Sequence, residues 1–140
     1  MTKELLIFHH IGIATKNLTE TKRIFEGFGL RLGEPIHVPN QKVNVCFSQR
    51  NSHPQIELIE PAAKDAPIHN ILNKVGTSPY HLCYQTPDLD SATKTLKQLG
   101  FLRLNDPSPS NALDENKICF FYHKHFGVLE VVEMRITKDP

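Results

Sequence analysis

The spacing of apolar residues changes along the chain from the alternation of a β-strand to the repeat of a helix and back, and it does so twice. The first half predicts a strand at about 5–15, a helix, and strands at about 30–36, 43–49 and 55–61. The second half predicts a strand at about 79–86, a helix, and strands at about 101–105, 117–123 and 127–135. A connecting helix is predicted at about 66–75, where Pro67 suits the first helical turn.

Start and stop signals define the two longer helices. Asn17, with Glu20 three residues later, and Asp88 are N-cap residues. Gly29 and Gly100 stand where a helix ends in a left-handed residue. The apolar stripes that we expect to be buried are Leu18, Phe25 and Phe28 in the first helix, and Leu89, Ala92, Leu96 and Leu99 in the second.

The two halves align with each other as copies of one module. A shift of 71 places residues 10–15 on 81–86, and a shift of 73 places 45–47 on 118–120 and 56–60 on 129–133. The offset changes in the Pro-rich stretches 35–40 and 106–116, which we interpret as loops that tolerate insertion.

This repeat predicts one domain over residues 1–140, with module one at about 5–62, the connecting helix at about 66–75 and module two at about 78–136. One unit of about 65 residues buries little surface alone, which favours two units packed together. The expected fold is α+β: two tandem βαβββ modules with mixed sheets, and with the helices on the outer faces.

Strand alternation separates four polar residues from the apolar faces. In the first strand of each copy the polar residue is a histidine, His10 or His81. In the last strand of each copy it is a glutamate, Glu57 or Glu130. All four are therefore expected on the sheet face turned away from the helices, where two imidazoles and two carboxylates would converge.

This set of side chains suits one divalent metal ion. Imidazole and carboxylate are ligands for Mn, Fe, Co, Ni or Zn, among which the sequence does not distinguish. Four ligands leave two positions on a six-coordinate ion for water or substrate oxygens. A lone histidine or glutamate on a strand is more often structural, and Glu60 and Glu133 also match across the repeat. The argument for a metal is therefore the joint pattern. Of the other histidines, His53 is expected in a loop, and His123 and His125 are candidates for substrate contact.

Composition narrows the class of protein. The chain has 140 residues, 39% of them hydrophobic and 22% charged, as expected of a globular protein. Lysine and arginine total 16 against 15 acidic residues, without the basic cluster that nucleic-acid binding requires. The sequence offers no membrane span and no signal peptide, so we expect a cytoplasmic protein. Three cysteines without a Cys-x-x-Cys pair are expected to be reduced.

These motifs resemble the vicinal oxygen chelate superfamily, which includes glyoxalase I, methylmalonyl-CoA epimerase, extradiol dioxygenases and bleomycin-resistance proteins. The resemblance covers residues 6–135 and is strongest to the epimerase branch and the glyoxalase-like proteins near it. The motifs that carry it are the segments 10–14, 56–61 and 127–131, and the connector that includes Pro67, Ile68, Lys74 and Gly76. The resemblance implies mixed sheets that curl around a metal-binding cavity. It also implies metal ligands at His10, Glu57, His81 and Glu130, the four residues that the repeat selects.

The resemblance also implies a reaction, the removal of a proton next to a carbonyl. Glu130 would be the base and Glu57 the opposing base for reprotonation. The epimerase branch often has glutamine where this chain has Glu57, whereas glutamate is common among glyoxalases. Some epimerases carry a further glutamate base in the third strand, where our alignment places Val45 beside Asn44.

Other functions remain open. A lactoylglutathione lyase would use the same four ligands, whereas a ring-cleaving dioxygenase would use two histidines and one carboxylate. A metal-free binding protein of the bleomycin-resistance kind, or a scaffold, would need none. The expected partner is a small molecule, an acyl thioester in the epimerase reading, and the modules could pair within one chain or across a homodimer. If the substrate carries coenzyme A, the basic residues available to bind its phosphates are Lys42, Arg50, Lys117 and Lys124.

Overall fold

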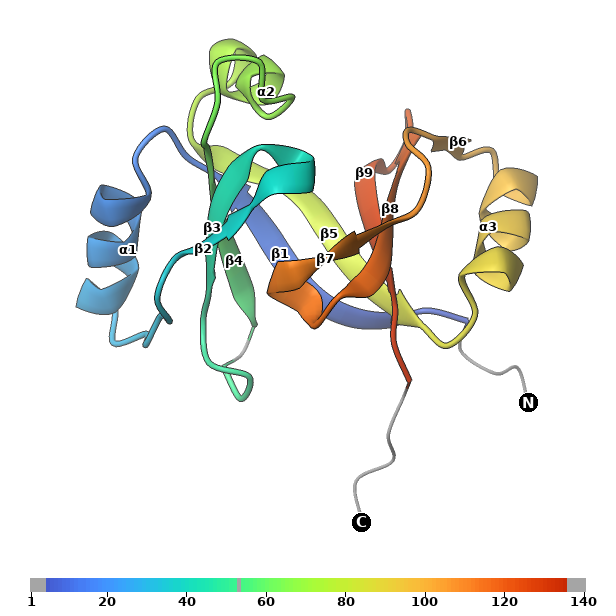
Figure 1. Cartoon of the computed structure of the whole chain (residues 1–140), viewed down its shortest axis with the longest axis horizontal. Helices are drawn as coiled ribbons and strands as arrows, with labels where there is room; N and C mark the ends of the chain where they lie inside the picture. Colours follow the sequence, from blue (N-terminus) through green and yellow to red (C-terminus); the bar gives the residue numbers. More distant parts are fainter. Residues whose placement is uncertain (1–4, 53, 136–140) are drawn as a thin grey trace. The chain divides into compact units, whose positions relative to one another are not determined.

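A computed structural model describes residues 5–52 and 54–135 of the chain (Figure 1). It contains two compact units. Of the described residues, 10–52 and 54–80 form the first unit, and 5–9 together with 81–135 form the second. Within the described ranges, each helix is too short or too polar to cross a membrane.

The first unit contains most of β1 (Ile7–Ala14), followed by α1 (Leu18–Gly27), β2 (Ile36–Val38), a 3-10 turn (Pro39–Gln41), β3 (Val43–Phe47), β4 (Ile56–Pro61) and α2 (His69–Lys74). The second unit contains most of β5 (Ser78–Thr86), followed by α3 (Leu89–Gln98), β6 (Leu102–Arg103), β7 (Ser108–Ser110), a second 3-10 turn (Asn111–Leu113), β8 (Asn116–His123) and β9 (Gly127–Glu133).

Each unit has a mixed sheet with the same arrangement of its first, middle and last strands. In the first unit, β1 runs parallel to β4, and β3 is antiparallel to both β2 and β4. In the second, β5 runs parallel to β9, and β8 is antiparallel to β9, β6 and β7. Two parallel strands need a crossover connection between them. This connection includes α1 in the first unit and α3 in the second.

The two crossover helices begin and end as the sequence predicts. The Asn17 side chain accepts a hydrogen bond from the backbone N–H of Glu20, and the Asp88 carboxylate accepts one from that of Ser91. Each cap satisfies an amide that has no partner inside its helix. Just beyond the helices, Gly29 and Gly100 both have φ of +96°, a conformation that favours glycine.

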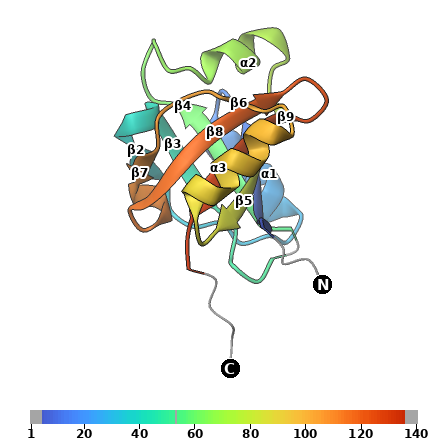
Figure 2. The same ribbon diagram turned by 90° about the vertical axis from the view of Figure 1, so that its right-hand side faces the viewer.

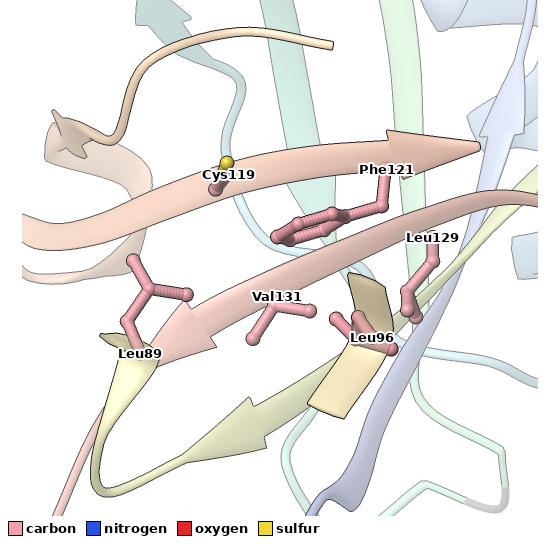
Figure 3. Packing of buried hydrophobic residues seen from close by; sticks show 6 residues of the cluster. All are labelled: Leu89, Leu96, Cys119, Phe121, Leu129 and Val131. Atoms are coloured by element: carbon pink, nitrogen blue, oxygen red, sulfur yellow. The ribbon is translucent and has the colours of Figure 1, made fainter. Parts of the chain in front are cut away.

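Each helix packs its apolar stripe on one face of its own sheet. Leu18 lies in a buried cluster with Ile56 and Leu58 of β4. In the second unit, α3 lies across β8 and β9 (Figure 2), and Figure 3 shows the side chains that meet there. These are Leu89 and Leu96 from the helix, Cys119 and Phe121 from β8, and Leu129 and Val131 from β9.

The last residue of each predicted stripe is not buried. Phe28 is 74% exposed and Leu99 is 62% exposed. Each is the C-cap of its helix, ten residues after the first buried leucine and therefore about 80° around the helix axis from it. The stripe predictions were wrong at these two positions because the helix ends before it returns to the core.

The predicted strand at 30–36 was also wrong. In that stretch Leu32 makes an isolated bridge to Ser48, and the strand β2 begins at residue 36. The Pro-rich stretches interpreted as loops contain β2 and β7, each three residues long and each followed by a 3-10 turn. The connecting helix is shorter than predicted and begins at His69, after Pro67.

The α+β fold class with mixed sheets is confirmed. The division into modules at about 5–62 and 78–136 stays a prediction, and residue 136 lies outside the described residues.

Candidate metal centre

His10 and Glu57 form a buried pair in the first unit. His10 Nε2 lies 3.1 Å from Glu57 Oε1. The histidine comes from β1 and the glutamate from the parallel strand β4, where Gly12 is the residue opposite Glu57. His10 is 0% exposed and Glu57 is 6% exposed. An imidazole and a carboxylate held together away from water favour either a strong hydrogen bond or a shared cation.

The second unit repeats this arrangement. His81 Nε2 lies 3.2 Å from Glu130 Oε1. His81 belongs to β5 and Glu130 to the parallel strand β9, where Cys83, two residues after the histidine, lies opposite the glutamate. His81 is 4% exposed and Glu130 is 2% exposed. The structure therefore brings each predicted histidine to the predicted glutamate of its own unit. The union of the two pairs in one four-ligand site stays a prediction.

Both glutamates lie on the sheet face predicted by alternation. The neighbours of Glu57, Ile56 and Leu58, pack against α1. The neighbours of Glu130, Leu129 and Val131, pack against α3. Because successive side chains of a strand point to opposite faces, each glutamate points away from its helix. The same side chain alternation that builds the core thus sets the direction of the acidic group.

Glu60 and Glu133, the other glutamates that match across the repeat, have a structural role. Glu60 Oε1 accepts a hydrogen bond of 2.9 Å from the backbone N–H of Leu18, the first residue of α1. Glu133 Oε2 accepts one of 2.8 Å from Leu89, the first residue of α3. A carboxylate at this position satisfies a free amide and complements the positive end of the helix dipole. These glutamates hold the helices to the sheets.

Two aromatic residues beside the pairs had no role in our interpretation of the sequence. The ring of Phe47 lies 5.2 Å from the His10 ring, with an angle of 83° between the ring planes. The ring of Phe120 lies 5.8 Å from the His81 ring at 82°. The repeat contained the signal, since a shift of 73 aligns the two phenylalanines. The sequence did not reveal which histidine each would contact.

Comparison with known proteins places the chain in a family. Residues 9–120 match the glyoxalase/bleomycin resistance protein/dioxygenase superfamily, also called the vicinal oxygen chelate superfamily. The chain belongs to this superfamily.

Individual relatives include an epimerase. The uncharacterized protein YqjC of Bacillus subtilis is 33% identical over 112 residues, which cover 79% of each chain. The ethylmalonyl-CoA/methylmalonyl-CoA epimerase of Cereibacter sphaeroides is 27% identical over 121 residues, 85% of this chain and 90% of that protein. The crystal structure of methylmalonyl-CoA epimerase from Mycobacterium tuberculosis covers 97% of this chain and 93% of its own with a TM-score of 0.82. At 22% identity, this last similarity shows the fold.

The structure shows where the side chains of Asn44 and Val45 lie, the two residues considered in the sequence as the position of a further base. Asn44 donates a hydrogen bond of 3.2 Å to Glu60 Oε2, so its side chain lies on the face of the sheet that carries α1. Val45 has the opposite direction by alternation, but its side chain has no group that exchanges protons. Neither residue can therefore act as a further base beside His10 and Glu57.

Three histidines outside the pairs, His37, His69 and His123, take part in packing or local hydrogen bonds. His37 Nδ1 lies 3.0 Å from Asn44 Oδ1, and His69 Nε2 lies 2.9 Å from the carbonyl oxygen of Ala63. His123 Nδ1 accepts a hydrogen bond from the backbone N–H of His125. Its ring also lies 5.1 Å from that of Phe101. His123 therefore joins the β8–β9 turn to the segment after α3. His53 lies outside the described residues.

The other residues singled out in the sequence are the three cysteines and four basic residues that could bind phosphates. All three cysteines are buried. Burial raises the pKa of the Cys46 thiol to about 11, which keeps it protonated at neutral pH. Lys42, Arg50, Lys117 and Lys124 are exposed, and the Lys42 ammonium donates a hydrogen bond to Asp65.

The ligand chemistry of the pairs fits a divalent ion. Each pair presents an imidazole Nε2 and a carboxylate oxygen at a separation that one ion could replace by two bonds of about 2.0–2.2 Å. Two carboxylates would balance the charge of a dication, which lowers the cost of burying it. Imidazole with carboxylate suits Zn, Fe, Co, Ni or Mn better than Ca or Mg.

Proposed function

We propose that this protein is a divalent-metal-dependent enzyme that removes and returns the proton next to the carbonyl of an acyl thioester, as a methylmalonyl-CoA epimerase does. His10, Glu57, His81 and Glu130 would hold the ion. The observation that carries the proposal is the buried His–Glu pair built in the same way in each unit. Membership of the superfamily and the epimerase relative support it.

The bound ion would supply a Lewis acid that stabilises negative charge developing on the substrate oxygens. Glu130 would take the α-proton. As the C–H bond breaks, its electron pair forms the C=C bond of an enolate. Glu57, after taking a proton from solvent, would deliver it to the other face of that carbon and invert its configuration, and Glu130 would then release its proton to solvent. Return of the proton from Glu130 would restore the original configuration.

Incubation of the metal-loaded protein with racemic methylmalonyl-CoA in D₂O tests the proposal. We expect deuterium to enter the α-position of both epimers. The variant Glu130→Gln should lose exchange into the epimer whose proton Glu130 takes, while it keeps most of its bound metal. Glu133→Gln is the matched control because Glu133 lies three residues away on β9 and contacts the start of α3. It should retain exchange. Full exchange by Glu130→Gln would contradict the role of Glu130, and failure of the purified protein to bind a divalent ion would contradict the metal site.

A lactoylglutathione lyase is the second candidate. The observation that favours it is the carboxylate of Glu57, where the epimerase branch often has an amide. The hemithioacetal of methylglyoxal and glutathione, tested in parallel, separates the two: conversion to lactoylglutathione without exchange into methylmalonyl-CoA would replace the epimerase proposal. A metal-free binding protein would show neither reaction and no bound metal.

A further inference from the structure

Each of the two His–Glu pairs is bordered by one phenylalanine from the middle strand of its sheet. Phe47 of β3 lies directly opposite Glu57 in the antiparallel ladder. Phe120 of β8 lies directly opposite Glu130. A phenylalanine that is a cross-strand neighbour of the glutamate and also contacts the histidine completes a three-residue unit in each sheet.

The contacts restrict each imidazole from two directions. His10 has Glu57 at its Nε2 and the ring of Phe47 nearly perpendicular to its own. His81 has Glu130 Oε1 3.2 Å from its Nε2 and the ring of Phe120 nearly perpendicular to its own. An imidazole turns about two side-chain bonds, and the terminal torsion is broad and soft unless neighbours restrict it. A perpendicular aromatic contact is favourable at these separations and would be lost if the imidazole turned.

We propose that Phe47 and Phe120 are positioning residues that fix the imidazoles of His10 and His81, so that each Nε2 faces the ligand position before an ion binds. This inference rests on the proposed metal site. Preorganised ligands bind an ion more tightly because less side-chain freedom is lost on binding. Residues that orient metal ligands typically change affinity by about 10- to 100-fold when they are replaced.

The two sides of β8 provide a matched control. Phe121 follows Phe120 in the chain but points to the opposite face, where it is fully buried in the cluster with α3 (Figure 3). Phe121→Leu therefore disturbs the core of the same unit without removing an aromatic contact to His81. The conservative variants Phe47→Tyr and Phe120→Tyr keep a ring at each position, and both side chains are partly exposed and thus have room for a hydroxyl.

The experiment is a Co²⁺ titration of the full-length metal-free protein, followed by visible absorption. We expect Phe47→Leu and Phe120→Leu each to weaken Co²⁺ binding about tenfold or more, and the tyrosine variants to restore it. Phe121→Leu should lower the unfolding temperature and leave Co²⁺ affinity within about twofold of the unsubstituted protein. In the metal-free protein, the ring ¹⁵N signals of His10 should broaden or shift in Phe47→Leu, and those of His81 in Phe120→Leu.

Unchanged Co²⁺ affinity and unchanged ring signals in the leucine variants would overturn the positioning role. So would an equal loss of affinity in Phe121→Leu, because affinity would then follow stability. If the unsubstituted protein binds no Co²⁺, the proposed metal site itself fails, and this outcome is distinct from the other two.

Discussion

Two glutamates on β4 show how neighbouring positions acquire different roles. Glu57 and Glu60 are three residues apart and therefore point to opposite faces of the strand. Glu60 points to the helix side, where a backbone N–H needs an acceptor. Glu57 points to the other side, where an imidazole is its partner. Glu130 and Glu133 repeat this division on β9. The residue type is the same in all four cases, and the direction of the side chain decides its chemistry.

The N-cap residue of α3 is ionisable and that of α1 is not. The stability that the α3 cap contributes should therefore depend on pH. Hydrogen bonds from the backbone N–H and the hydroxyl of Ser91 hold the pKa of the Asp88 carboxyl below its usual range. A carboxylate whose pKa is lower in the folded state contributes stability above its unfolded pKa of about 3.9. That contribution disappears as the pH falls through the folded value. Asn17, the equivalent cap of α1, has no such dependence.

We therefore expect the stability advantage of the unsubstituted protein over Asp88→Asn to be constant at neutral pH and to shrink as the pH falls below about 4. Urea unfolding midpoints of both proteins between about pH 7 and pH 3 would measure it. Asn17→Asp should introduce the same acid-sensitive component at α1. An advantage over Asp88→Asn that does not depend on pH would show that the Asp88 charge contributes nothing to the cap.

At the scale of elements, the ends of α1 and α3 use the same backbone conformation in different surroundings. Gly29 and Gly100 share a φ of +96°. A Cβ added at Gly29 would meet nothing within 4 Å, whereas one at Gly100 would lie 3.1 Å from Nε2 of His123. Gly100, just beyond α3, therefore lies close to the His123 side chain at the end of β8, whereas the equivalent position after α1 has no neighbour within that distance.

Alanine at these two glycines should separate backbone strain from crowding. Gly29→Ala should cost about 1–2 kcal/mol, because a left-handed alanine is strained. Gly100→Ala should cost more than Gly29→Ala, because its methyl group would lie 3.1 Å from Nε2 of His123 and the ring would have to shift by a few tenths of an ångström. Denaturant unfolding measures both. In a His123→Ala background the excess at Gly100 should vanish. Equal costs for the two alanine variants in the presence of His123 would contradict the crowding.

The sequence allowed the longer elements and the direction of the two candidate glutamates to be predicted, for physical reasons. Asn17 and Asp88 cap their helices through local hydrogen bonds, and the direction of Glu57 and Glu130 depends only on strand alternation. The strands β2 and β7 are three residues long and adjoin or contain proline, so they have too few residues for a periodic signal. Phe47 and Phe120 were missed because their contacts depend on strand register.

At the scale of the whole molecule, the proposed site needs both units. Each unit supplies one imidazole and one carboxylate. Two such ligands make a weak site, and four on one ion make a strong one. An ion that binds only the native protein stabilises it by an amount set by its concentration relative to the dissociation constant, about 2.7 kcal/mol at a hundredfold excess. Metal binding and the stability of both units are therefore expected to be linked.

Thermal unfolding with and without Co²⁺ would test this linkage. We expect Co²⁺ to raise the unfolding temperature of the unsubstituted protein and a chelator to reverse the rise. His10→Ala and His81→Ala should each abolish most of the shift, although they lie in different units, because each removes one ligand from the same ion. His37→Ala is the control, since His37 is exposed and contacts Asn44. If His10→Ala and His81→Ala each kept about half of the shift, the two pairs would bind separate ions and the single four-ligand site would be wrong.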